Sequence, residues 1–287
     1  MSDIDFQAPA SLQDALALLG QAGQTRPLAG GTDLMVQMRS GRMPAQRILD
    51  LKRIPGLIGI ESGPAGFVIG AATPCAQIGE HAGLAAAWPG VVEAARLIGS
   101  TQVQGRASLG GNLCNASPAA DSVPALIAAG AVLRVAGPAG ERELAAESFQ
   151  RGPGRNALAP GEVLVAIALP ARAPRSGDAY LRLIPRTEMD IAVAGAGVWL
   201  ALDADRRVIQ ARVALGAVAP TALRVDAAAQ ALIGSRLDDD GLARLAAAAS
   251  AACRPIDDKR GTAAYRTRVA GVLARRAAAI AYERACA

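Results

Sequence analysis

The chain has 287 residues, of which 52% are hydrophobic, and a formal net charge of +5. This length suits one large domain or two or three small ones, and no dense basic run with interleaved aromatic side chains indicates nucleic-acid binding. The N-terminus lacks the apolar segment of a signal peptide, and no apolar stretch reaches membrane-spanning length. We therefore expect a cytoplasmic protein without a membrane segment.

The first part of the chain predicts short helices and strands in mixed order. Ser11 can cap the first helix, with Asp14 at capping-box distance. The predicted elements, in chain order, are a helix over 9–25, a strand at 25–29, a short helix at 34–39, a strand at 47–51, a hairpin across 58–69, helices opening at 73 and covering 90–98, a helix from 121 to 130, and strands at 131–135 and 162–169.

The segment over 171–178, which contains Pro, Ser, Gly and Asp, has the composition of a linker, so we place the main domain boundary there, between 1–172 and 173–287. Beyond it we predict strands at 179–184, 191–202 and 208–215 and Ala-rich helices at 242–252 and 262–284. This order predicts an α+β fold, because it lacks the regular strand–helix alternation of a doubly wound sheet.

Cysteine and histidine usage limits the chemistry. The four cysteines stand far apart without a C-x-x-C pair, which argues against a structural zinc site or an iron–sulfur cluster within this chain. The single histidine, His81, lies in a polar, helix-like stretch, so a histidine-dependent catalytic triad is not indicated. We predict no metal ligands and no catalytic side chains, and any redox chemistry would need a bound cofactor.

Two glycine-rich segments are the main functional signal. The first is Ala29-Gly30-Gly31-Thr32-Asp33, and the second is Ser108-Leu109-Gly110-Gly111-Asn112. A Gly-Gly step allows positive φ and leaves no Cβ to block a ligand, and each segment is followed by a capped helix start that favours an anion. Neither fits the Rossmann or P-loop spacing. An ordinary turn explains one such step, but two together indicate a site that holds a diphosphate from both sides.

These segments resemble the FAD-binding (medium) subunit of the molybdenum hydroxylases, the family of xanthine dehydrogenase and carbon monoxide dehydrogenase. The resemblance extends to Ser117-Pro118-Ala119-Ala120-Asp121 and to a third segment over 186–192, and it covers essentially the whole chain. It implies a two-lobed FAD-binding domain of the vanillyl-alcohol-oxidase (PCMH) type, with lobes of about 1–55 and 56–172. It also implies a C-terminal α+β domain of the carbon monoxide dehydrogenase flavoprotein type, with a three-stranded sheet and a helix bundle.

The resemblance further implies FAD as the cofactor, with residues 29–33 and 108–112 around its diphosphate. It places Asp121 in the adenosine region, Leu164 on the adenine and Ile191 over the isoalloxazine. Arg182 stands where relatives have a lysine near the flavin. The cofactor-binding residues expected from it are Ala29, Gly30, Gly31, Thr32, Asp33, Ser108, Leu109, Gly110, Gly111, Asn112, Ser117, Asp121, Leu164, Arg182 and Ile191.

In function, the resemblance implies an electron-transfer subunit of an oxidoreductase that is not complete alone. Its partners would be an iron–sulfur small subunit and a molybdenum-cofactor large subunit, in a dimer of heterotrimers. Electrons would pass from the iron–sulfur clusters through FAD to an external acceptor. A self-contained flavin oxidase with the same fold is the alternative, as is a structural subunit with an empty cleft. The substrate and the final acceptor stay open.

Overall fold

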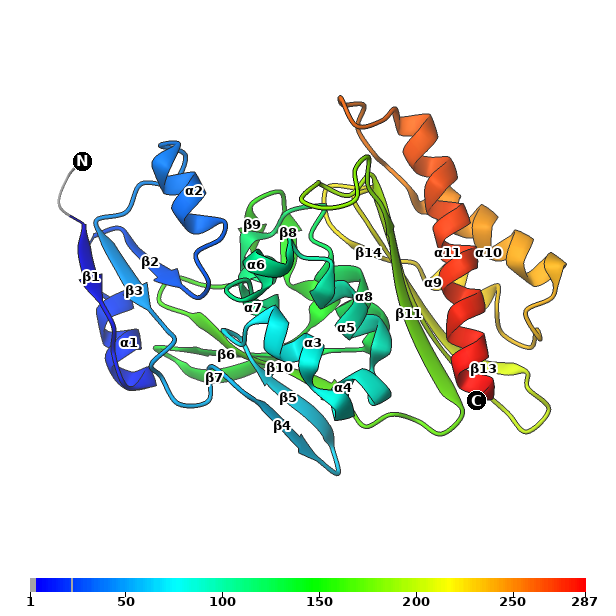
Figure 1. Ribbon diagram of the computed structural model, residues 1–287, viewed down its shortest axis with the longest axis horizontal. Helices are drawn as coiled ribbons and strands as arrows, with labels where there is room; N and C mark the ends of the chain where they lie inside the picture. The colour runs from blue at the N-terminus through cyan, green and yellow to red at the C-terminus, as the bar shows by residue number, and fades with distance from the viewer. Residues whose placement is uncertain (1–3, 22) are drawn as a thin grey trace.

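The structure is a computed structural model that describes residues 4–21 and 23–287. Its three parts lie in a row, with the N-terminal lobe at one end, the second lobe in the middle and the C-terminal domain at the other end (Figure 1). No helix in the described ranges is both long enough and apolar enough to cross a membrane.

The first lobe is a three-stranded parallel sheet in the order β1-β3-β2 with two helices. Its elements are β1 (Asp5–Gln7), α1 (Leu12–Leu19), β2 (Thr25–Leu28), α2 (Leu34–Arg39) and β3 (Arg47–Asp50). As predicted, Ser11 caps α1 by accepting from the Asp14 N–H. The predicted helix over 9–25 was too long, because α1 stops before Gly20 and β2 starts at Thr25. Residue 22 of that prediction, like the first three residues of the predicted lobe, lies outside the described residues.

The second lobe is a five-stranded antiparallel sheet in the order β4-β5-β10-β6-β7. Strand β10 (Val163–Pro170), the last strand of this lobe in the sequence, lies at the centre of the sheet, and its apolar residues are mostly buried. The strands are β4 (Ile60–Gly63), β5 (Gly66–Gly70), β6 (Val132–Gly137), β7 (Gly140–Ala145) and β10 (Val163–Pro170), with the small hairpin β8 (Gln150–Gly152) and β9 (Arg155–Asn156).

Helices of the second lobe occupy the chain between β5 and β6. They are α3 (Cys75–Glu80), α4 (Ala82–Ala87), α5 (Pro89–Arg96), α6 (Thr101–Gln104), α7 (Leu109–Asn115) and α8 (Ser122–Ala129), and a 3₁₀ turn, η1 (Ala146–Ser148), follows β7. His81 lies between α3 and α4, where its Nδ1 accepts from the Leu84 N–H and caps α4.

The C-terminal domain is an antiparallel sheet in chain order with helices on one side. It comprises β11 (Ser176–Leu183), β12 (Ala194–Leu202), β13 (Val208–Gly216), β14 (Leu223–Arg224), α9 (Asp226–Gln230), α10 (Asp239–Ala252) and α11 (Ala263–Cys286). The sheet has four strands, against the three expected, because the short β14 adds to its edge. The predicted linker is also too long, since Ser176 already begins β11 and Asp178 is buried.

The second lobe and the C-terminal domain share one apolar core. Helix α8 packs against β12 and β13, and buried side chains of both parts, such as Leu126 and Trp199, belong to the same cluster. The two parts therefore meet across an interface that contains buried apolar side chains from both.

Candidate cofactor site

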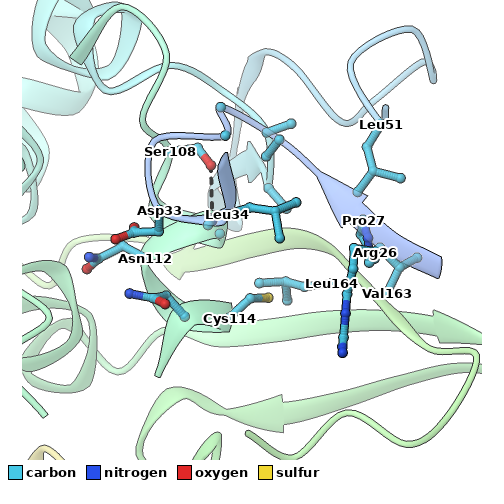
Figure 2. Close-up of a pocket in the computed structure, with 18 of the residues that line it drawn as sticks. Arg26, Pro27, Asp33, Leu34, Leu51, Ser108, Asn112, Cys114, Val163 and Leu164 are labelled. Atoms are coloured by element: carbon cyan, nitrogen blue, oxygen red, sulfur yellow. Dashed lines mark hydrogen bonds between the residues drawn. The ribbon is translucent and has the colours of Figure 1, made fainter. Parts of the chain in front are cut away.

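A cavity of about 600 Å³ lies between the two N-terminal lobes (Figure 2). The structure brings most of the predicted site residues to its wall, although they come from segments some eighty residues apart in the chain. Those that line it are Ala29, Gly30, Gly31, Thr32, Asp33, Ser108, Gly110, Gly111, Asn112 and Leu164.

The first glycine-rich segment is held by backbone contacts. A Cβ on Gly30 would stand 1.9 Å from the Arg106 carbonyl oxygen, so the absence of a side chain lets this segment touch the chain just before the second one. Gly31 has φ +78°, which a residue with a side chain rarely adopts. Lys52 Nζ donates to the Ala29 carbonyl at 2.9 Å and so fixes the start of the segment.

The second segment forms the first turn of α7, and Ser108 caps it by accepting from the Gly111 N–H at 3.0 Å. The suggested use of positive φ is wrong here, because neither Gly110 nor Gly111 has it. These glycines matter because they lack a side chain. A Cβ on Gly110 would stand 2.3 Å from the Ala71 carbonyl oxygen, whereas a Cβ on Gly111 would contact only the Ser108 Oγ, at 3.2 Å. Gly110 thus serves packing, and Gly111 leaves the cavity wall open.

Two polar side chains at the cavity, Asn112 and Asp33, differ in their hydrogen bonding. Asn112 accepts from the Ser122 hydroxyl at 2.6 Å through Oδ1, which leaves its amide N–H groups available to a ligand. Asp33 occupies the N-cap position of α2 but makes no capping hydrogen bond with its side chain, and burial raises the pKa of its carboxyl.

Sequence reasoning missed an amide contact that joins the lobes. Gln37 Nε2 donates to Asn115 Oδ1 at 2.8 Å, linking α2 to α7 across the cavity, and both residues line it. Helical spacing offered a signal for Gln37, because it follows Asp33 by four residues and therefore shares its face of α2.

The other predicted residues lie outside the cavity lining. Leu109 is buried, the Ser117 hydroxyl accepts from the nearby Ala119 N–H, and Ile191 is 50% exposed in the loop between β11 and β12. Arg182 and Asp121 form an ion pair, with 2.6 Å between Arg182 Nη1 and Asp121 Oδ2. The resemblance places Asp121 in the adenosine region and Arg182 near the flavin, and the structure brings these two side chains into direct contact.

Tyr180 completes this buried group, because its hydroxyl donates to Asp121 Oδ1 at 3.2 Å. Burial raises the pKa of Asp121 to about 6, although Arg182 and the Tyr180 hydroxyl act in the opposite direction. The pair connects the start of α8 in the second lobe to β11 in the C-terminal domain. It therefore ties the start of α8, which follows the second segment in the chain, to the C-terminal domain.

Asp121→Asn should remove a pH dependence of stability. Because the folded-state pKa of Asp121 lies above its unfolded value, its ionisation disfavours folding as pH rises from about 4 to 6. The free energy of unfolding of the wild type, relative to the variant, should fall across this range by on the order of 3 kcal/mol. Urea titrations at pH 4, 5, 6 and 7 measure it, and parallel profiles for the two proteins would contradict the assignment.

Gly111→Val should weaken FAD binding while the fold persists. The new side chain would enter the open wall of the cavity, where only the Ser108 hydroxyl approaches it. We expect a loss of at least tenfold in FAD affinity, about 1.4 kcal/mol. Flavin fluorescence titration gives the affinity and circular dichroism checks the fold; wild-type affinity would show that the cofactor lies elsewhere.

Family models cover both parts of the chain. Residues 2–172 match the FAD binding domain in molybdopterin dehydrogenase, and residues 179–281 match the CO dehydrogenase flavoprotein C-terminal domain. The chain is an FAD-binding subunit of the molybdenum hydroxylase family. The recognised family, the two-part α+β fold and the cofactor FAD are thereby confirmed, and the subunit is one part of an oxidoreductase.

Individual relatives agree with this assignment. The FAD subunit is 37% identical over 283 residues to the carbon monoxide dehydrogenase medium chain of Afipia carboxidovorans, covering 98% of this chain and 97% of the relative. It is 32% identical to the xanthine dehydrogenase FAD-binding subunit of Escherichia coli O157:H7, covering 78% and 77%. A structure of reconstituted CO dehydrogenase from Oligotropha carboxidovorans superposes with a TM-score of 0.94 at 36% identity, covering 99% of both chains.

Proposed function

We propose that this FAD subunit relays electrons from the iron–sulfur clusters of a small subunit, through FAD, to an external acceptor. A molybdenum-cofactor large subunit would oxidise the substrate and supply the electrons. The observation that carries the proposal is the cavity, which offers two diphosphate-holding segments but little for acid–base chemistry. Bound FAD supplies the redox chemistry, and the chain's residues hold and orient it.

The titratable groups at the cavity support a holding role. Burial raises the pKa of the Cys114 thiol to about 12, so it stays protonated and unreactive. Glu162 is paired with Arg142, which lowers the pKa of its carboxyl. Asp33 is the remaining carboxyl among the described lining residues. This set favours the relay over a self-contained flavin oxidase, which usually needs an acid–base group over the ring.

We also propose where Asp121, Arg182 and Ile191, which lie outside the cavity lining, sit relative to FAD. We place the ion pair of Asp121 and Arg182 beside the flavin half of FAD, with Ile191 covering the ring. The half-exposed Ile191 side chain lies on a loop of the C-terminal domain, where it is free to pack on an exposed flavin edge. Leu164 would contact the adenine.

Ile191→Ala should expose the flavin to solvent without loosening the diphosphate. We expect faster reoxidation of the reduced flavin by oxygen, by about twofold or more, and an FAD affinity within about threefold of wild type, or 0.7 kcal/mol. Stopped-flow absorbance after photoreduction measures the reoxidation rate. An unchanged rate and an unchanged visible spectrum would contradict the placement of Ile191.

The relay itself is tested with the complex. The chain is co-expressed with an iron–sulfur and a molybdenum subunit encoded in the same host, and native mass spectrometry is expected to give a dimer of heterotrimers. Removing FAD from this complex should stop reduction of the external acceptor, while substrate still reduces the iron–sulfur clusters. Sustained substrate oxidation by this chain alone, free of molybdenum and iron, would overturn the proposal and favour the oxidase.

A further inference from the structure

A second cavity, of about 450 Å³, lies at the junction of the second lobe and the C-terminal domain. It is found where α11 ends beside the start of β11 (Figure 1). None of the described residues that line it also lines the cofactor cavity. Its charged lining residues are Arg172, Arg175, Asp203, Arg206 and Arg284. We call it the arginine cavity.

The four arginines reach this cavity from four separate places in the chain. Arg172 follows β10 at the end of the second lobe, and Arg175 immediately precedes β11. Arg206 lies in the turn between β12 and β13, and Arg284 lies in the last turn of α11. Because they start from different elements, their guanidinium groups can surround one ligand.

Two of these arginines are paired with carboxylates across the junction. Arg172 Nη1 lies 3.1 Å from Asp178 Oδ1 in β11, and Arg284 pairs with Glu93 in α5. Both pairs join the second lobe to the C-terminal domain. The charges of these two arginines are therefore balanced, and they supply hydrogen-bond donors at the sides of the cavity.

The other two arginines give the cavity an excess of positive charge. Within residues 4–21 and 23–287, neither Arg175 nor Arg206 forms an ion pair with a carboxylate. Arg175 Nη1 donates to the Asp203 carbonyl oxygen at 2.9 Å. The Asp203 carboxylate accepts from the backbone N–H of Arg207 at 2.8 Å. Two unpaired guanidinium groups thus stand against one carboxylate in the cavity wall.

Arg175 and Arg206 also have backbone conformations that favour glycine. Their φ angles are +50° and +60°. Six described residues other than glycine have positive φ, and these two both line the arginine cavity. A side chain in this region strains the backbone, and such strain is concentrated at functional sites. Glycine would fit either position with less strain, so the fold alone does not account for two arginines here.

The lining indicates the class of ligand. Guanidinium groups bind phosphate and carboxylate oxygens through paired hydrogen bonds. A phosphoryl group presents oxygens in several directions and so can accept from arginines on different sides, whereas the two oxygens of a carboxylate lie in one plane. No aromatic side chain is present among the described lining residues to stack on a nucleotide base. A compact phosphate anion therefore fits better than a nucleotide.

We propose that the arginine cavity binds a compact phosphate anion, with Arg175 and Arg206 as its main ligands and Arg172 and Arg284 at its sides. The anion bridges the second lobe and the C-terminal domain, because Arg172 belongs to the first and the other three arginines belong to the second. This site is separate from the cofactor cavity and does not depend on the proposed electron relay.

The test uses the full chain loaded with FAD, so that the cofactor cavity is filled, and titrates it with pyrophosphate at constant ionic strength. Isothermal titration calorimetry should show saturable one-to-one binding, and Tm should rise with pyrophosphate concentration. Citrate should bind about fivefold more weakly or worse, and ADP no more tightly than pyrophosphate. Lack of saturable pyrophosphate binding would overturn the proposal, as would equal binding of citrate or tighter binding of ADP.

Arg175→Gly and Arg206→Gly separate binding from stability. Each variant should weaken pyrophosphate about tenfold, or 1.4 kcal/mol. Without pyrophosphate, the Tm of each should equal or exceed that of the wild type, because glycine adopts positive φ freely. Arginines that serve only the fold would give the reverse result, a lower Tm and an unchanged affinity, and this result would overturn the proposal.

Arg275→Gln is the matched control, because Arg275 is an exposed arginine of α11 that does not line the arginine cavity. Its pyrophosphate affinity should stay within about twofold of wild type. Circular dichroism checks each fold. If a glycine variant does not fold, asparagine replaces it, because asparagine tolerates positive φ and carries no charge, and the same loss is expected. An equal loss in the Arg275 variant would overturn the proposal.

Discussion

Gly30→Ala should abolish tight FAD binding by the full chain. The added Cβ would stand 1.9 Å from the carbonyl oxygen and 2.5 Å from the carbonyl carbon of Arg106, both of them backbone atoms. The two glycine-rich segments would have to separate, and the diphosphate could no longer contact both. We expect FAD affinity to fall at least a hundredfold, about 2.8 kcal/mol, as measured by flavin fluorescence titration.

Gly105→Ala is the control for this change. It lies next to Arg106, but its added Cβ would meet only the Gln102 carbonyl oxygen at 3.5 Å, an ordinary contact. FAD affinity should stay near the wild-type value in this variant. If Gly30→Ala bound FAD as tightly as Gly105→Ala does, the close approach of the segments would not be required for binding.

Gly197→Val should separate the C-terminal domain from the second lobe. A Cβ on Gly197 in β12 would stand 2.5 Å from the Pro124 carbonyl oxygen in α8. Overpacking at such a contact destabilises by about 3 kcal/mol, and urea unfolding measures the loss. FAD affinity should fall as well, because Ser122 at the start of α8 positions Asn112.

Gly63→Val tests whether any glycine substitution has this effect. Gly63 ends strand β4, and nothing lies within 4 Å of the position that its Cβ would take. Its free energy of unfolding should stay within about 0.5 kcal/mol of wild type, as for most surface changes. Equal destabilisation by the two variants would show that the interface of α8 and β12 tolerates a side chain.

Local patterns predicted much of this fold. The cap at Ser11, the helix that Gly130 ends and the strand that becomes β10 follow from capping, glycine and apolar runs. The two glycine-rich segments predicted a common cavity because two Gly-Gly steps, each beside a helix start, suit a single diphosphate site better than two unrelated turns. Element ends were predicted less well: the first helix ends at Leu19 with Gly20 as its C-cap, a local signal that the longer prediction passed over.

Contacts between residues that are far apart in the sequence could not be predicted from the sequence alone. The pairing of Asp121 with Arg182 depends on how β11 docks beside α8, and neither side chain carries a local sign of its partner. The same holds for Gln37 and Asn115, which meet only after the two lobes close. The convergence of four arginines on the arginine cavity is likewise visible only in three dimensions.

The central place of β10 has a consequence for synthesis on the ribosome. Strands β5 and β6 do not pair with each other. Both pair with β10, which is the last strand of this sheet to be synthesised. Until residue 170 has left the exit tunnel, the nascent chain presents two unpaired strand edges, which attract other chains. Loading of FAD must also wait, because Leu164 and both glycine-rich segments form one cavity. Chains released early from translation should therefore aggregate rather than persist as flavin-free fragments.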